Sequence, residues 1–164
     1  MVRLTHYPDL DLFYVDQPMA EIPLYEFASE HWFAMVETQF RERVQAALAR
    51  DPHLKLAFSL CEVFTDPPAH IGPGAVGWSV RMQAGQFEFF ARELGGMQHK
   101  VIARYDDIQP LVRFRVGGDV ERAKHYASLG EALARTGRVR VVGTLPPLPR
   151  EFATLHDAVA ERTL

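Results

Sequence analysis

The sequence predicts an α+β fold in which a five-stranded, mostly antiparallel sheet carries helices packed over one face. The first observation is a change in apolar spacing, from steps of three or four before residue 51 to strict alternation after residue 54. The second is the short distance between glycine-containing turns in the alternating region, which is typical of hairpins. A chain of 164 residues, 48% of them hydrophobic, has room for one domain of ordinary size.

The first 28 residues are expected to form an extended arm, and residues 29–164 a single domain. Pro8, Pro18 and Pro23 each forbid the interior of a helix, and the aromatic rings of this segment prefer to be covered.

The domain is expected to begin with a helix that Ser29 caps and that runs to about Arg50, where Asp51 and Pro52 stop it. Its apolar stripe consists of Phe33, Val36, Phe40, Val44 and Leu48.

Four strands are expected between residues 54 and 105, arranged as an antiparallel meander. One face of the first strand carries Leu56, Phe58 and Leu60, and the opposite face, with Lys55, Ala57 and Ser59, is expected to be solvated. The following segments are, in order, a loop at Thr65–Gly74, a strand at Val76–Gln83, a turn at Ala84-Gly85, a strand at Gln86–Leu94, a turn at Gly95-Gly96 and a strand at Met97–Tyr105.

The last third of the chain is expected to form three helices and a fifth strand. Asp106 or Asp107 can cap a helix over Ile108–Phe114 with Pro110 in its first turn, and Asp119 can cap the next helix, which Thr136-Gly137 closes. A short strand follows, and Pro149 then opens a helix whose buried stripe is Phe152, Leu155 and Val159. The short strand lies at Arg138–Val142.

Charge and composition exclude several classes of function. The formal net charge of −3 provides no field for a polyanion, so no nucleic-acid partner is expected. No apolar run approaches the roughly 20 residues that span a bilayer, so no integral membrane insertion is expected. Cys61, the single cysteine, cannot form an internal disulfide, and the first residues do not read as a signal peptide, so we expect a cytoplasmic protein.

Motifs for metal, cofactor or covalent chemistry are not evident. Glu121 and His125 stand four residues apart on an expected helix, which is more typical of a surface pair than of a metal site. The segment Val116–Asp119 lacks the spaced glycines of a phosphate-binding loop. We therefore expect no metal and no cofactor, and we interpret Cys61 as a small hydrophobic residue rather than a nucleophile.

Glu62 is the most informative polar residue, because alternation puts it on the same side as Phe58 and Leu60, where it interrupts an apolar face. It either emerges at the edge of the sheet or is a pocket carboxylate with a raised pKa. Asp66 and His70 lie four apart in the proline-rich loop, which can mount a general acid and its orienting group or can simply be a stiff connection.

Four segments resemble, in their order, the sterol carrier protein 2 family of lipid-transfer domains. They are FAMVETQFRERVQAALARDPHLKLAFSL, GWSVRMQAGQFEFF, HKVIARYDDIQPLV and RVRVVGTLPPLPREFATLHDAV, which together cover about residues 33–162. The resemblance implies a five-stranded sheet with helices over one face and an apolar tunnel between them, and it names no catalytic residue. The residues that it places in the tunnel are Phe40, Val44, Trp78, Val80, Met82, Phe87, Phe89, Phe152 and Leu155.

The leading hypothesis is binding or transfer of a hydrophobic small molecule, such as a fatty acid, acyl-CoA, sterol or similar lipid, in an apolar tunnel. The alternative is a small isomerase, lyase or hydrolase that acts on a hydrophobic substrate in the same cavity. Its acid–base residues would come from Glu62, Asp66, His70, His99 and Tyr105. A third hypothesis is an interaction module whose Phe-rich surface is covered by another copy, in a homodimer, or by a different subunit.

Overall fold

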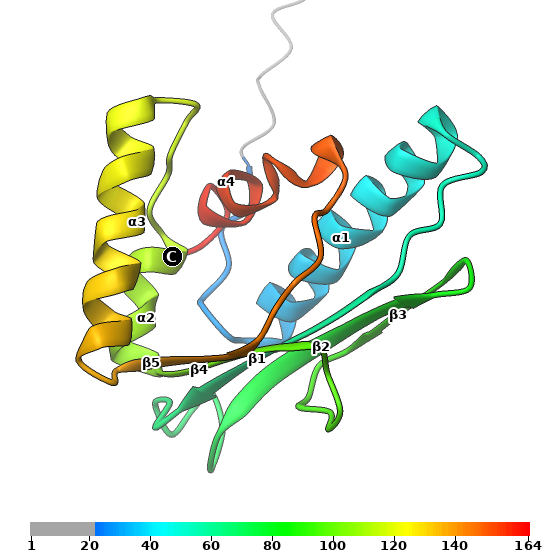
Figure 1. Ribbon diagram of the computed structural model, residues 1–164. Coiled ribbons are helices and arrows are strands. Elements are labelled where there is room, and N and C mark those ends of the chain that lie inside the picture. The colour runs from blue at the N-terminus through cyan, green and yellow to red at the C-terminus, as the bar shows by residue number, and fades with distance from the viewer. Residues whose placement is uncertain (1–21) are drawn as a thin grey trace, which may run out of the picture.

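The computed structural model describes residues 22–164, so most of the expected arm lies outside the described residues. The helices and strands follow one another along the chain as Figure 1 labels them. Their bounds are α1 Glu30–Arg50, β1 Phe58–Thr65, β2 Val76–Gln83, β3 Gln86–Phe90, β4 His99–Arg104, α2 Tyr105–Val112, α3 Val120–Arg135, β5 Val139–Gly143, the 3₁₀ turn η1 Arg150–Phe152 and α4 Leu155–Ala160.

The five strands form one sheet in the order β3-β2-β1-β4-β5, and all the labelled helices lie on one side of it (Figure 1). Three neighbouring pairs are antiparallel, and β1 with β4 is parallel. The predicted α+β class, with five mostly antiparallel strands and helices over one face, is confirmed. The predicted four-stranded meander is wrong, because β4 does not continue from β3 but crosses to the far side of β1.

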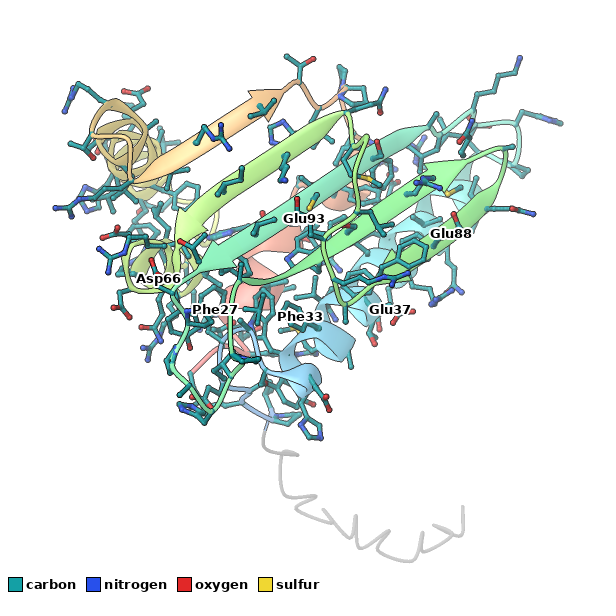
Figure 2. All side chains as sticks on the ribbon, turned by 90° about the horizontal axis from the view of Figure 1, so that it is seen from below. Phe27, Phe33, Glu37, Asp66, Glu88 and Glu93 are labelled. Carbon is teal, nitrogen blue, oxygen red and sulfur yellow. The ribbon has the colours of Figure 1, made fainter. Side chains whose placement is uncertain are left out.

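The crossing segment, residues 91–98, runs under the face of the sheet that the helices leave free. Figure 2, seen from below, shows Glu93 of this segment lying over the strands. Two serines fasten it: Ser79 Oγ donates to Arg92 O and accepts from Leu94 N, both at 2.9 Å. Ser59 Oγ accepts from Gln98 N at 2.9 Å. The prediction of a solvated face is therefore wrong at Ser59, which is 9% exposed, because the crossing segment covers it.

The first helix has the predicted bounds and cap. Ser29 accepts a hydrogen bond from Trp32 N at 3.2 Å, which satisfies one of the free N–H groups of the first turn. The opposite end of the domain meets this turn, because the Trp32 indole Nε1 donates to Thr163 Oγ1 at 2.8 Å in a buried contact. A parallel bridge between Tyr25 and Thr163 completes the junction.

Residues 22–28, the described end of the expected arm, contribute directly to the core. Phe27 is 0% exposed, and its ring centroid lies 5.1 Å from Trp32 and 4.8 Å from both Phe64 and Tyr105. The Tyr105 hydroxyl donates to Phe27 O at 3.0 Å. This aromatic cluster joins the arm to the start of α1, to β1 and to the start of α2, and Figure 2 labels Phe27 within it.

Two later helices differ from their predicted limits. Helix α2 begins at Tyr105, so Pro110 is an internal residue rather than part of the first turn. The last helix is broken into η1 and α4. The helix that Asp119 was expected to cap is confirmed as α3, since Asp119 Oδ1 accepts from Glu121 N at 2.8 Å. No residue of α3 is fully buried, so this helix is the least embedded wall of the domain.

Candidate ligand-binding cavity

A cavity of about 190 Å³ lies between the sheet and the helices. Its wall draws on α1, α2, α3 and α4 above and on β1, β2 and β4 below, which places it under the arch of helices seen in Figure 1. The lining is apolar apart from a few polar groups. The lining residues are Trp32, Val36, Phe40, Leu60, Glu62, Trp78, Val101, Ile108, Leu111, Val112, Tyr126, Leu155, His156 and Val159.

Glu62 reaches the cavity because strand alternation and sheet order both put it there. It lies on β1, the central strand, opposite Trp78 of β2 on one side and Val101 of β4 on the other. Of the two alternatives left open by the sequence, the edge position is wrong. Burial raises the pKa of Glu62 to about 7, and the neighbouring Trp78 indole opposes this rise by favouring the charged form.

Trp78 carries the clearest unmet polar group of the site. The residue is 4% exposed, and its ring stacks on Phe89 with centroids 5.7 Å apart. Its buried Nε1 lies near enough to the Glu62 carboxyl group to lower the pKa of that group, but it forms no well-aligned hydrogen bond to any residue in the range 22–164. An unpaired buried N–H donor is costly and marks a place where a ligand group can be useful.

Tyr126 of α3 and His156 of α4 add a second polar pair to the wall. The His156 Nε2 lies 2.7 Å from Phe114 O, and because a carbonyl only accepts, this nitrogen carries a hydrogen. In the neutral ring Nδ1 is then an acceptor, and the Tyr126 hydroxyl lies 3.5 Å from it, at the outer limit of a hydrogen bond. Burial, with the charges of Glu62 and Asp157, raises the pKa of Tyr126 to about 12.

The cavity wall is therefore mostly apolar and carries three polar features. These are the carboxyl group of Glu62, the indole N–H of Trp78 and the hydroxyl–imidazole pair of Tyr126 and His156. No lysine or arginine is among the lining residues. Across residues 22–164 no three histidine, cysteine or acidic side chains gather as a metal ion would require.

The structure separates the residues that the resemblance placed in a tunnel. Phe40, Trp78 and Leu155 line the cavity. The other six lie elsewhere in the core or at the β3 edge, and their role in binding stays a prediction. These six are Val44, Val80, Met82, Phe87, Phe89 and Phe152.

The five residues of the enzyme alternative are not brought together, because Glu62 is the one that lines the cavity. Asp66 is exposed and lies 3.5 Å from Arg104, and His70 is exposed with its Nε2 2.6 Å from Glu26. His99 and Tyr105 lie outside the lining, on β4 and at the start of α2.

Sequence reasoning missed Tyr126 and His156 as site residues. Tyr126 lies among mostly apolar residues of the helix predicted after Asp119, and His156 follows Leu155 in the last helix without any motif around it. The one signal in the sequence was that Tyr126 and His156 each put a polar group on an otherwise apolar helix face. This signal indicates a pocket only when the two helix faces are known to lie against each other.

The fold and cavity together define a class, an α+β domain with a mainly apolar chamber between sheet and helices. Several solved structures are similar to this chain. A structure titled "UbiJ-SCP2 Ubiquinone synthesis protein" has 18% identity and a TM-score of 0.38, covering 77% of this chain and 92% of that chain. A crystal structure of sterol carrier protein 2 has 14% identity and a TM-score of 0.42, covering 83% and 93%.

A third similar structure is a conserved hypothetical protein from Thermus thermophilus, titled as possibly a sterol carrier protein. It has 13% identity and a TM-score of 0.44, covering 86% of this chain and 92% of that chain. At these identities the similarities concern the fold alone. No family model and no curated protein sequence matches the chain. Within residues 22–164, none of the helices has the length and apolar character needed to cross a bilayer.

Proposed function

We propose that this chain binds and carries a small hydrophobic molecule in the cavity between its sheet and helices. The observation that supports this proposal most directly is the mainly apolar chamber of about 190 Å³, whose wall carries a few polar groups. An empty apolar cavity of about 150 Å³ is enough to hold benzene, so this chamber suits a ring-sized body or a short alkyl segment.

The size of the chamber also bears on longer lipids. A fatty acid, acyl-CoA or sterol would place only part of its apolar body in the chamber as it stands, because drug-sized ligands occupy roughly 300–1,000 Å³. The rest would need the wall to move. Displacement of helix α3 would uncover only partly buried residues, since none of its residues is fully buried.

The strength of binding can be bounded from burial. A ring-sized ligand removes roughly 150–200 Å² of apolar surface from water, which at about 25 cal/mol per Å² gives about 4–5 kcal/mol. That free energy corresponds to a dissociation constant of about 1 mM or somewhat below. Titrations should therefore reach millimolar ligand.

The chain contains a built-in reporter for the test, because its two tryptophans, Trp32 and Trp78, both line the cavity. We expect toluene to give a saturable change in tryptophan emission excited at 295 nm, with a matching rise in the unfolding temperature. Absence of a saturable change at the solubility limit of toluene would overturn the proposal.

Two matched variants locate the binding. Val159→Phe fills the chamber from α4 and should abolish the response, whereas Val142→Phe makes the same change at a residue that is 49% exposed on β5 and should leave it intact. An equal response in both variants would show that toluene binds elsewhere.

The proposed compartment rests on the cysteine content of the chain, as in the sequence analysis. We propose a reducing compartment such as the cytoplasm, supported by a single cysteine, Cys61, that is fully buried. No contact among residues 22–164 favours the enzyme or homodimer alternative over ligand binding.

A further inference from the structure

We propose that the cavity selects a ligand whose polar end is a hydroxyl group, an apolar alcohol or phenol of single-ring size. In this arrangement the Trp78 indole Nε1–H donates a hydrogen bond to the oxygen of the ligand hydroxyl. The Glu62 carboxyl group accepts a hydrogen bond from the same hydroxyl. The inference rests on the proposed function and specifies the ligand class of the same chamber.

The donor side of this match is the unsatisfied indole. Trp78 lines the chamber, is 4% exposed, and faces the Glu62 carboxyl group without forming a well-aligned hydrogen bond to it or to any other of residues 22–164. The other cavity tryptophan provides the contrast, since the Trp32 Nε1 already donates to Thr163 Oγ1 at 2.8 Å. A ligand oxygen beside Trp78 would therefore satisfy a donor that folding has left unpaired.

The acceptor side is Glu62, the residue directly opposite Trp78 in the β1–β2 register. Directly opposed residues on neighbouring strands point to the same face of a sheet, so the carboxyl group and the indole address the same region of the chamber. A hydroxyl group is both a donor and an acceptor, and it can bond to the two residues at once.

Other head groups match less well. A carboxylate would meet Glu62 as a like charge in a chamber whose lining includes no lysine or arginine. The nearby imidazole of His156 already uses its Nε2–H on Phe114 O. An ammonium group could pair with Glu62, but it offers no acceptor to the Trp78 N–H and must be stripped of its water.

The test uses four ligands on one skeleton: toluene, benzyl alcohol, benzylamine and benzoate, titrated at pH 8 with tryptophan emission as the readout. We expect benzyl alcohol to bind at least tenfold more tightly than benzoate and more tightly than benzylammonium. Equal or tighter binding of benzoate or benzylammonium would overturn the inference. Toluene has no polar group, so its binding tests the proposed function, which is binding of an apolar molecule in the chamber. The comparison of the three polar ligands tests the preference for a hydroxyl group.

Two variants test the donor. Trp78→Phe should lower the preference for benzyl alcohol over toluene by about fivefold, the size of one hydrogen bond of about 1 kcal/mol. Val142→Phe, at an exposed residue of β5 outside the cavity wall, should leave this preference unchanged. Each variant keeps at least one tryptophan as a reporter. An unchanged preference in Trp78→Phe would refute the role of the indole.

A measurement on the unmodified protein covers the case in which Trp78→Phe does not fold. The chain has two indole N–H protons, and one of their NMR resonances should move downfield with benzyl alcohol and not with toluene. If both resonances respond alike to the two ligands, no hydrogen bond forms to the hydroxyl and the inference is wrong.

Discussion

Replacing Glu62 by glutamine is expected to change how the free energy of unfolding depends on pH. Burial raises the pKa of Glu62 from its ordinary value of 4.5 to about 7, so the folded protein holds this proton more tightly than the unfolded chain does. The stability associated with the protonated carboxyl is complete below pH 4.5. It is lost progressively as the pH rises through about 7.

The magnitude follows from the two pKa values. They differ by about 2.5, and one pKa unit corresponds to about 1.4 kcal/mol, so ionised Glu62 costs the folded protein about 3 kcal/mol above pH 7.5. Glutamine has nearly the shape of a protonated glutamate and does not ionise. The variant should match the parent within about 1 kcal/mol at pH 4.5 and exceed it by about 3 kcal/mol at pH 8.5.

Urea denaturation followed by tryptophan emission at several pH values between 4.5 and 8.5 measures this difference. Subtracting the parent from the variant removes the contribution of all other titrating groups. Glu88→Gln, the same change at an exposed residue of β3, is the matched control and should give a nearly flat difference. A flat difference for Glu62→Gln as well would refute the argument that the carboxyl is desolvated.

Five further substitutions, at four positions, test the framework around the cavity, with the denaturant midpoint as the readout. Gly143→Ala should cost about 2 kcal/mol or more, since the backbone there has φ of 75° and an added Cβ would lie 1.9 Å from Gln98 O. Gly118→Ala is the control, because φ there is 73° but nothing lies near the added Cβ, so it measures the backbone strain alone. An equal loss of stability in the two variants would exclude a contribution from the clash at residue 143. Gly130→Ala, inside α3 with nothing within 4 Å, should stabilise by about 0.5–1 kcal/mol, and a loss would contradict the open space. Ser29→Ala should cost about 1 kcal/mol through the lost cap, while Ser29→Asp should retain most of it, and equal losses would show that the cap contributes little.

The fold class and most of the element bounds could be predicted because they depend on local patterns. Residues close together in the sequence determine the apolar stripe of the helix after Ser29 and the alternation of β2. The same holds for the turn at Ala84-Gly85, where φ is 51° and 80°. The sheet order could not be predicted in this way. Pairing of β1 with β4 joins residues about 40 apart, and two glycines at 95 and 96 look like a hairpin turn whether or not the chain crosses over.

The central position of β1 was not predicted either, because the alternation of residues 54–60 indicated a strand with one solvated face. In the structure β1 is buried almost continuously from Phe58 to Phe64, including Ser59 and Cys61. A strand buried on both faces belongs inside a sheet with both faces covered.

The candidate site could be predicted in part for a related reason. Glu62 was found because a charge on an apolar strand face is anomalous in a short stretch of sequence. Tyr126 and His156 become site residues only when α3 and α4 close over the sheet, a long-range arrangement without a local signal. The unpaired Trp78 N–H is likewise a property of the packed core rather than of the residue.

The junction of the two ends of the domain has a consequence for synthesis. Tyr25 exchanges backbone hydrogen bonds of 2.8 Å with Arg162 and Leu164, and the Trp32 indole reaches Thr163. On the ribosome, α1 and the β1–β2 hairpin emerge early, but the partners that seal the Trp32 side of the chamber are the last of the domain to be translated. The contacts that hold Trp32 in place therefore form only after residues 162–164 have left the exit tunnel, and a nascent chain stalled before that point would expose the apolar wall of the chamber.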